Sequence, residues 1–160
     1  MTKKRAITYT LFAFSAFLIY SHGLCWAISI SAPGSWPQTI NASNLTGGAG
    51  SNLTPTYESD PAAVSITITA AGNWKVQVKT IASTLPGSLH LYIQRTSDGS
   101  GLGSISGGNS YQEVTDIDQD FFSGNIDRSN VSIQLELTGV SIQVPPDTYT
   151  ATIQYTVSDQ

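Results

Sequence analysis

Apolar residues alternate with small polar ones at every second position over long stretches of this chain, a period typical of β-strands. The clearest run is Val131–Thr138, in which Val, Ile and Leu occupy the odd positions and Ser, Gln, Glu and Thr the even ones. The same alternation marks Val64–Thr69, Trp74–Lys79, Leu89–Gln94 and Tyr149–Val157. Successive side chains of a strand point to opposite faces, so each run has one apolar and one polar face. No stretch after residue 27 shows a sustained period of 3.6 residues, the signature of amphipathic helices.

These runs predict an all-β domain, an antiparallel immunoglobulin-like β-sandwich of about seven strands, with a partly open barrel as the alternative. The turn residues at 70–73 predict that Val64–Thr69 and Trp74–Lys79 form a β-hairpin. Gly139 is expected to bend the chain, with residues 140–144 continuing as a strand in the shifted phase. Residues 96–110, rich in Gly and Ser, are interpreted as a mobile loop.

The apolar positions of these runs form the expected core, because they would face the opposite sheet. They are Val64, Ile66, Ile68, Trp74, Val76, Val78, Leu89, Leu91, Ile93, Val131, Ile133, Leu135, Tyr149, Ile153 and Tyr155.

The first 27 residues have the layout of a secretory signal peptide. A basic head at residues 3–5 precedes an apolar run over residues 6–20, and Cys25-Trp26-Ala27 places small side chains where a signal peptidase reads them. Cleavage after Ala27 leaves residues 28–160 as a single domain and removes the only cysteine, which excludes disulfides and cysteine-based zinc sites. The protein is therefore expected to be secreted, periplasmic or on the cell surface. An uncleaved membrane anchor is the alternative.

The charge of the domain argues against two classes of partner. After cleavage, only Lys75, Lys79, Arg95 and Arg128 remain against 11 acidic residues. Nucleic-acid binding depends on cation–phosphate contacts, and docking on anionic membranes likewise needs basic clusters. Neither nucleic acid nor a membrane is expected as a partner of the cleaved protein.

The last strand carries a resemblance to known proteins. The stretch Val144–Val157, which reads VPPDTYTATIQYTV, resembles the closing strand of secreted bacterial β-sandwich proteins, the spore-coat-U-like and archaic-pilin-like families. Asp147 stands where those endings usually have glycine, and those families tend to carry cysteines that residues 28–160 lack. The resemblance implies an exported surface sandwich and suggests pilus or coat assembly.

Three aspartates at alternate positions, Asp116, Asp118 and Asp120, are candidate calcium ligands, with Asp127 following further along. Calcium prefers several hard oxygen ligands, and carboxylates spaced along a strand repel one another unless a cation lies between them. The alternative is that they form the solvated outer face of a strand.

Two aromatic residues are candidate sugar-binding groups. Trp36 lies between Ser35 and Pro37 outside any clear strand, and Tyr92 shares the polar face of its strand with His90. Flat aromatic side chains exposed on a sheet can stack on sugar rings.

No enzyme activity is expected from this sequence. His90 has no recognisable nucleophile motif, and the chain contains no HExxH or GxSxG pattern. Glu58, Glu113 and Glu136 could form a glycosidase pair only if the fold brought them to a separation of about 5–10 Å.

The sequence thus predicts a non-enzymatic structural or adhesive protein that acts through protein–protein contacts or self-assembly, as a pilus-like or coat-like subunit. Its mechanism could be strand addition, in which the alternating segment Ile28–Ala32 pairs with a neighbouring chain or with the edge of its own sheet. The alternative is a β-sandwich module that binds carbohydrate or calcium; no other cofactor is expected.

Overall fold

The computed structural model describes residues 27–160, so nearly all of the predicted signal peptide lies outside the described residues. The described part contains ten strands and one turn of 3-10 helix: β1 (Ser29–Ser31), η1 (Ala42–Asn44), β2 (Tyr57–Glu58), β3 (Val64–Thr69), β4 (Asn73–Ser83), β5 (His90–Arg95), β6 (Ile105–Gly107), β7 (Gln112–Glu113), β8 (Gln119–Asn125), β9 (Arg128–Thr138) and β10 (Ala151–Asp159).

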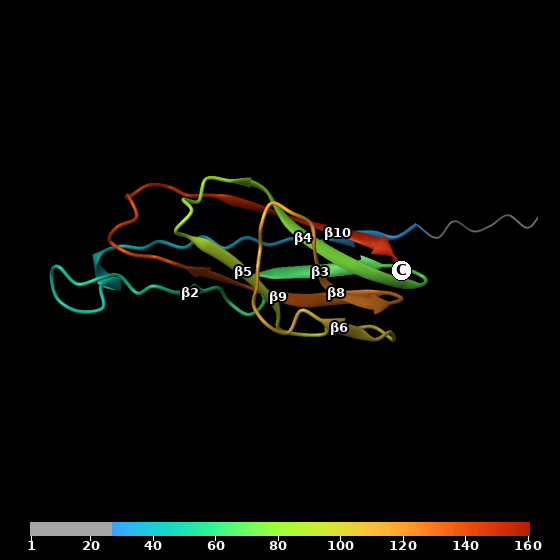
Figure 1. The fold of residues 1–160 in the computed structure, drawn as a ribbon. Helices are drawn as coiled ribbons and strands as arrows, with labels where there is room; N and C mark the ends of the chain where they lie inside the picture. The colour runs from blue at the N-terminus through green and yellow to red at the C-terminus, as the bar shows by residue number, and fades with distance from the viewer. Residues whose placement is uncertain (1–26) are drawn as a thin grey trace, which may run out of the picture.

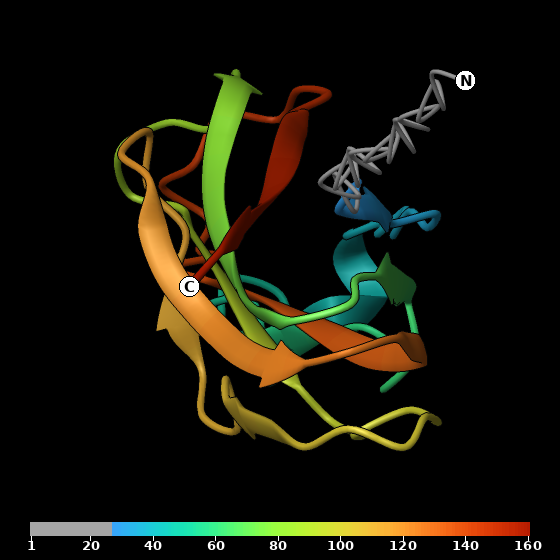
Figure 2. The ribbon, with the colours of Figure 1, turned by 90° about the vertical axis from the view of Figure 1, so that its right-hand side faces the viewer.

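The strands form two antiparallel sheets (Figures 1 and 2). The six-stranded sheet has the order β1-β3-β9-β5-β7, with β2 added to β9, and the four-stranded sheet has the order β10-β4-β8-β6. The prediction of an all-β antiparallel fold is confirmed. The strand number exceeds the prediction because β2, β6 and β7 are too short to produce a visible alternation.

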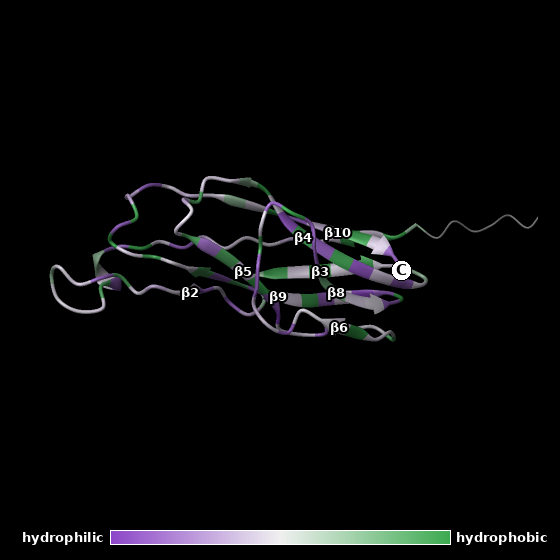
Figure 3. Ribbon diagram, in the orientation of Figure 1, coloured by the Kyte–Doolittle hydropathy of each residue, from purple (hydrophilic) through white to green (hydrophobic). Residues whose placement is uncertain are grey.

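The core lies between the facing sheets, and alternation along each strand places its apolar residues there (Figure 3). Ile66, Trp74, Val76, Ile93 and Ile133 are 0% exposed. Twelve of the fifteen predicted core residues are buried: Val64, Ile66, Ile68, Trp74, Val76, Val78, Leu89, Leu91, Ile93, Val131, Ile133 and Leu135. The three that are not fully buried, Tyr149, Ile153 and Tyr155, lie in or just before β10.

The predicted hairpin of residues 64–69 and 74–79 is wrong, because β3 and β4 belong to different sheets. β3 pairs with β1 and β9, whereas β4 pairs with β10 and β8. The turn between them connects one sheet to the other at one end of the sandwich. Alternation does not distinguish these arrangements, since both runs face the same core either way.

The predicted strand at residues 140–144 is also absent. Gly139 follows the last residue of β9 with a φ of 81°, a left-handed conformation that glycine adopts readily. The chain then turns instead of extending, and the Val144 N–H donates to the Ser141 carbonyl at 3.1 Å. Val140 still contributes to the buried apolar set with 5% exposure.

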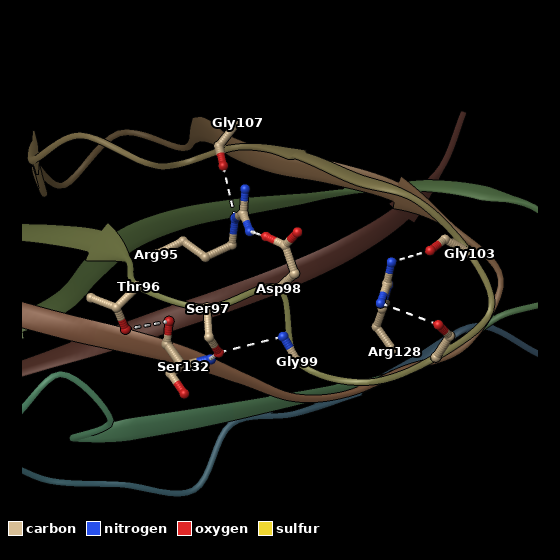
Figure 4. Close-up of polar contacts among 10 residues, drawn as sticks. Arg95, Thr96, Ser97, Asp98, Gly99, Gly103, Gly107, Arg128 and Ser132 are labelled. Atoms are coloured by element: carbon tan, nitrogen blue, oxygen red, sulfur yellow. Dashed lines mark hydrogen bonds and ion pairs between the residues drawn. The ribbon is translucent and has the colours of Figure 1, made fainter.

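The segment at residues 96–110, interpreted from its composition as a mobile loop, is tied to the rest of the fold. β6 pairs with β8, and Ser100 forms an isolated bridge with Ser129. Two buried arginines, Arg95 and Arg128, also donate to backbone carbonyls of this segment (Figure 4). Glycine and serine allow this close packing, so composition alone misrepresented the segment.

Candidate functional site

An apolar groove of about 1210 Å³ opens between the two sheets on one side of the molecule. The six-stranded sheet contributes Val64, Leu91 and Leu135 to its lining, and β10 contributes Ile153 and Tyr155. The segment that follows β1, from residue 32 to residue 40, and the connection from residue 140 to residue 150 supply further lining residues. We refer to this feature as the groove.

The groove exists because β10 is an edge strand whose apolar face is incompletely covered. Within residues 27–160, β10 pairs only with β4, so its second side has no strand partner. The inward residues of β10, from Ala151 to Val157, are all partly exposed, whereas Trp74, Val76 and Val78 on β4 are at most 1% exposed. Figure 2 shows the red β10 and the blue β1 at sheet edges that face the same side.

The strand order shows what is missing beside β10. In an immunoglobulin sandwich one sheet holds strands A, B, E and D in that order, and the other holds C, F and G, with G beside F. Here β1, β3, β9 and β5 follow the first order, and β4 and β10 correspond to C and F. Among the described strands, none occupies the position of G. The groove opens beside β10, on the side where strand G lies in that order.

The entry to β10 is held in place by two sets of polar contacts. The Tyr149 hydroxyl donates to the Pro145 carbonyl at 2.7 Å, which fixes the turn before the strand. The Thr84 N–H donates to the Thr150 carbonyl at 2.8 Å, and the Thr150 N–H donates to the Thr84 hydroxyl at 2.8 Å. The open edge is therefore a positioned strand rather than a frayed end.

The start of the described chain lies on the edge of its own sheet. β1 pairs with β3, with Ile30 opposite Ile68, and Ile28, Ile30 and Ala32 pack against the core. β1 also lies close to β10. Of the two arrangements expected for this segment, the single chain adopts pairing within its own sheet.

The lining of the groove is mainly apolar and carries few ionisable groups. Apart from its tyrosines, its lining contains one ionisable side chain, the exposed Asp147. The Tyr155 hydroxyl is buried without a protein hydrogen-bond partner, and burial raises the pKa of Tyr155 above its ordinary value. The Tyr155 side chain adds apolar area to the groove, and its raised pKa keeps the hydroxyl neutral.

A second arrangement lies on the outer face of the six-stranded sheet. The register places Glu58, Glu136, Tyr92 and Glu113 in one row across β2, β9, β5 and β7. Neighbouring strands are about 4.8 Å apart, so adjacent members of the row lie within reach of one another. The structure therefore brings together the three glutamates that the sequence left unplaced, and it adds Tyr92 to them.

Burial and, after it, electrostatic repulsion raise the pKa values of Glu136 in this row and of the nearby Tyr111. Burial, followed by the negative charge of Glu58, raises the pKa of the Glu136 carboxyl. Burial and the charges of Glu58 and Glu136 raise the pKa of Tyr111 to about 12. His90 Nδ1 lies 2.6 Å from the Glu113 carboxylate. The face is thus acidic and rich in hydrogen-bonding groups, with an aromatic ring among them.

The predicted calcium ligands face lysines of the neighbouring strand. Asp118 lies 2.8 Å from the Lys79 amine, and Asp120 lies 3.1 Å from that of Lys75, while Asp116 is exposed. Hydrogen bonds from Lys75, and then from Gln77, lower the pKa of Asp120. No three His, Cys, Asp or Glu side chains of residues 27–160 are arranged to hold a metal ion. Calcium binding by these aspartates stays a prediction.

The two predicted sugar-binding aromatics are not brought together. Trp36 is partly buried and lines the groove, packed against the core. Tyr92 stands on the outer face of the six-stranded sheet. Sequence reasoning did not find the groove, because its strand residues, such as Leu91, Leu135 and Ile153, were interpreted as ordinary core, and most of its other lining residues lie in loops.

Comparisons with family models, with curated proteins and with solved structures found no match for this chain. In the part of the chain that the structure describes, no helix has the length and apolar character needed to cross a membrane. The function must therefore be argued from the groove and the outer face themselves.

Proposed function

We propose that this protein is a non-enzymatic structural subunit that acts through protein–protein contacts, and that it accepts an added β-strand beside β10. The observation that carries the proposal is the inner face of β10, which alternates like a core strand yet remains partly exposed. Strand addition to an open sheet edge supplies backbone hydrogen bonds, and pockets for alternate side chains supply specificity.

The groove can supply a useful binding energy to such a strand. Fully burying one large aliphatic side chain contributes about 1.5–3 kcal/mol, and an inserted strand would bury one at every second position. Association and ordering of the strand offset part of this gain. β10 spans Ala151–Asp159, which is long enough for several such positions.

The donor that this chain itself offers is the segment Ile28–Ala32 of a second copy. Ile28, Ile30 and Ala32 alternate with serines, and Pro33 ends the alternation. In its own sheet the segment contributes only the three residue pairs of β1 with β3, so releasing it breaks few backbone hydrogen bonds. The predicted export would place the resulting assembly outside the cytoplasm, as a pilus-like or coat-like subunit.

Size-exclusion chromatography with light scattering tests this proposal on residues 28–160 over a concentration series. We expect oligomers that grow with concentration for the wild-type sequence. Ile153→Asp places a charge in the groove and should leave monomers. Gln154→Asp, on the adjacent exposed position of β10 that does not line the groove, is the matched control and should assemble normally. A wild-type protein that stays monomeric at every concentration would refute self-assembly by this route.

A second candidate function is carbohydrate binding on the outer face of the six-stranded sheet. Tyr92 stands between Glu136 and Glu113 in register, and the Gln94 amide donates to Gln134 at 2.9 Å beside them. An aromatic ring surrounded by carboxylates and amides offers stacking and hydrogen bonds to sugar hydroxyls. A glycan array probed with the wild-type protein and with Tyr92→Ala tests this function, and a blank array for both would remove it.

A further inference from the structure

The two ends of the sandwich differ in character, and the strand register identifies what lies at each. β9 runs from Arg128 at one end to Thr138 at the other, a span of about 33 Å at roughly 3.3 Å per residue. The first end contains the start of β1, the β3–β4 turn, the β8–β9 turn and the C-terminus. Ser29 of β1 pairs with Thr69 at the end of β3. The Ile126 N–H of the β8–β9 turn donates to the Gly72 carbonyl of the β3–β4 turn, and the C-terminal Gln160 N–H donates to the Asn73 carbonyl. Figure 1 shows the start and the end of the described chain together there.

The first end also carries an exposed apolar apex. Residues 99–104, which we call the glycine loop, pack against the β8–β9 turn, where the Ser104 N–H donates to the Asn125 side chain at 2.7 Å. Leu102 lies in the middle of this loop and is 98% exposed, the highest value among the exposed large hydrophobic residues of the described chain. Single exposed apolar residues are common on protein surfaces, so exposure alone would carry no conclusion.

Hydrogen bonds from a buried arginine hold the backbone on both sides of Leu102. Arg128, which is 8% exposed, donates to the carbonyls of Gly101 and Gly103, the two neighbours of Leu102 (Figure 4). A Cβ atom at Gly101 would collide with the Asp127 carbonyl, and one at Gly103 with the Asn125 carbonyl. The glycines thus allow the loop to press against the turn, and Leu102 cannot fold back onto the surface. The backbone position of Leu102 is therefore fixed before binding, which reduces the backbone entropy lost on association.

The opposite end carries a receptor of matching chemistry. Ile142, which is 53% exposed, lines the groove together with Val144 and Pro145, in the connection between the end of β9 and the start of β10. One end of the molecule therefore projects an apolar side chain, and the other end offers an apolar hollow. Two different patches on one chain make a heterologous contact, which repeats from copy to copy in one direction.

We propose that Leu102 docks at the mouth of the groove of the next copy, near Ile142, and forms the second contact of a head-to-tail assembly. This inference rests on the proposed function, because Ile28–Ala32 and the glycine loop lie at the same end of the sandwich. A neighbour that receives the donated strand in its groove therefore faces Leu102 as well. The occupant of the groove mouth is a second copy of this chain.

Complementation between two variants tests the inference on residues 28–160, with self-association measured by light scattering and sedimentation. Leu102→Asp and Ile142→Asp should each weaken self-association by about tenfold or more, with unchanged thermal unfolding because both side chains are exposed. Ile117→Asp, at a residue that is 69% exposed and lies outside the groove and the glycine loop, is the matched control and should assemble like the wild type.

Mixing the two defective variants gives the decisive result. The Leu102 end of the Ile142→Asp chain and the groove end of the Leu102→Asp chain are both intact, so the mixture should form dimers and nothing larger. If Leu102→Asp assembles as tightly as the wild type, or the mixture stays monomeric, the docking of Leu102 is refuted while strand addition stands. A wild-type protein that does not assemble refutes the proposed function and this inference with it.

Discussion

Truncating two isoleucines on facing sheets should separate a complete core position from an incomplete one. Ile133 on β9 is 0% exposed, whereas Ile153 on β10 is partly exposed at the groove. Ile133→Ala should lower the free energy of unfolding by about 2–5 kcal/mol, because it removes buried methylenes and leaves a closed cavity. Ile153→Ala should lower it by about 1 kcal/mol, because the site is open to water and only part of the side chain is buried.

Binding of a strand should reverse this difference. A peptide of residues 28–40 at about 100 times its dissociation constant would stabilise the wild-type protein by about 2.7 kcal/mol. Ile153→Ala should lose much of that stabilisation, because Ile153 becomes buried only when the groove is filled. Ile133→Ala should keep it, since Ile133 does not line the groove. Urea denaturation followed by circular dichroism measures both effects, because the peptide contains Trp36 and would add to the tryptophan fluorescence.

Equal losses from the two substitutions in the free protein would refute this reasoning. They would mean that the inner face of β10 is already buried in the isolated chain. A stabilisation by the peptide that is unchanged in Ile153→Ala would place the peptide elsewhere on the molecule.

Three further predictions concern individual polar contacts. Arg128→Met should lower the free energy of unfolding by about 1–3 kcal/mol, because the carbonyls of Gly101 and Gly103 lose their donor, and hydrogen exchange of residues 99–104 should accelerate. Glu136→Gln should raise the melting temperature at pH 7 and leave it unchanged at pH 3. The reason is that the raised pKa of Glu136 favours the folded state below about pH 4.5. This contribution is lost as the pH rises through the folded-state pKa, so the glutamate destabilises the folded state at pH 7 relative to glutamine. Tyr149→Phe should lower the free energy of unfolding by about 0.5–1.5 kcal/mol in chemical denaturation, through loss of the hydrogen bond to the Pro145 carbonyl.

Alternation predicted the buried faces of β3, β4, β5 and β9 correctly because period two is a local property of each strand. Val64, Ile66 and Ile68 are buried whichever strands flank β3. The partner of each strand is a non-local property, and the pattern of β3 and β4 is the same in a hairpin as in a crossing between sheets. The fold class was therefore predictable from the sequence and the pairing of these two strands was not.

The polar sites depend on register in the same way. Asp118 and Asp120 were recognisable as an acidic series, but their lysine partners are set by the pairing of β8 with β4. The row of Glu58, Glu136 and Tyr92 likewise joins three strands that are distant in sequence. No local sequence pattern predicts such a row, because it depends on which strands pair and in which register.

The disagreement over β10 has a different origin, because there the local pattern and the three-dimensional structure conflict. Ile153 and Tyr155 alternate with polar residues as a buried face does, and Tyr149 fixes the entry to the strand, yet the folded chain leaves this face partly exposed. A sequence specifies one structure when its local pattern and its packing agree, and natural proteins depart from this agreement mainly at functional sites. The apolar positions of β10 become consistent with their surroundings once another strand lies beside them. The residues at which sequence and single-chain structure conflict are therefore the residues at which a partner is expected to bind.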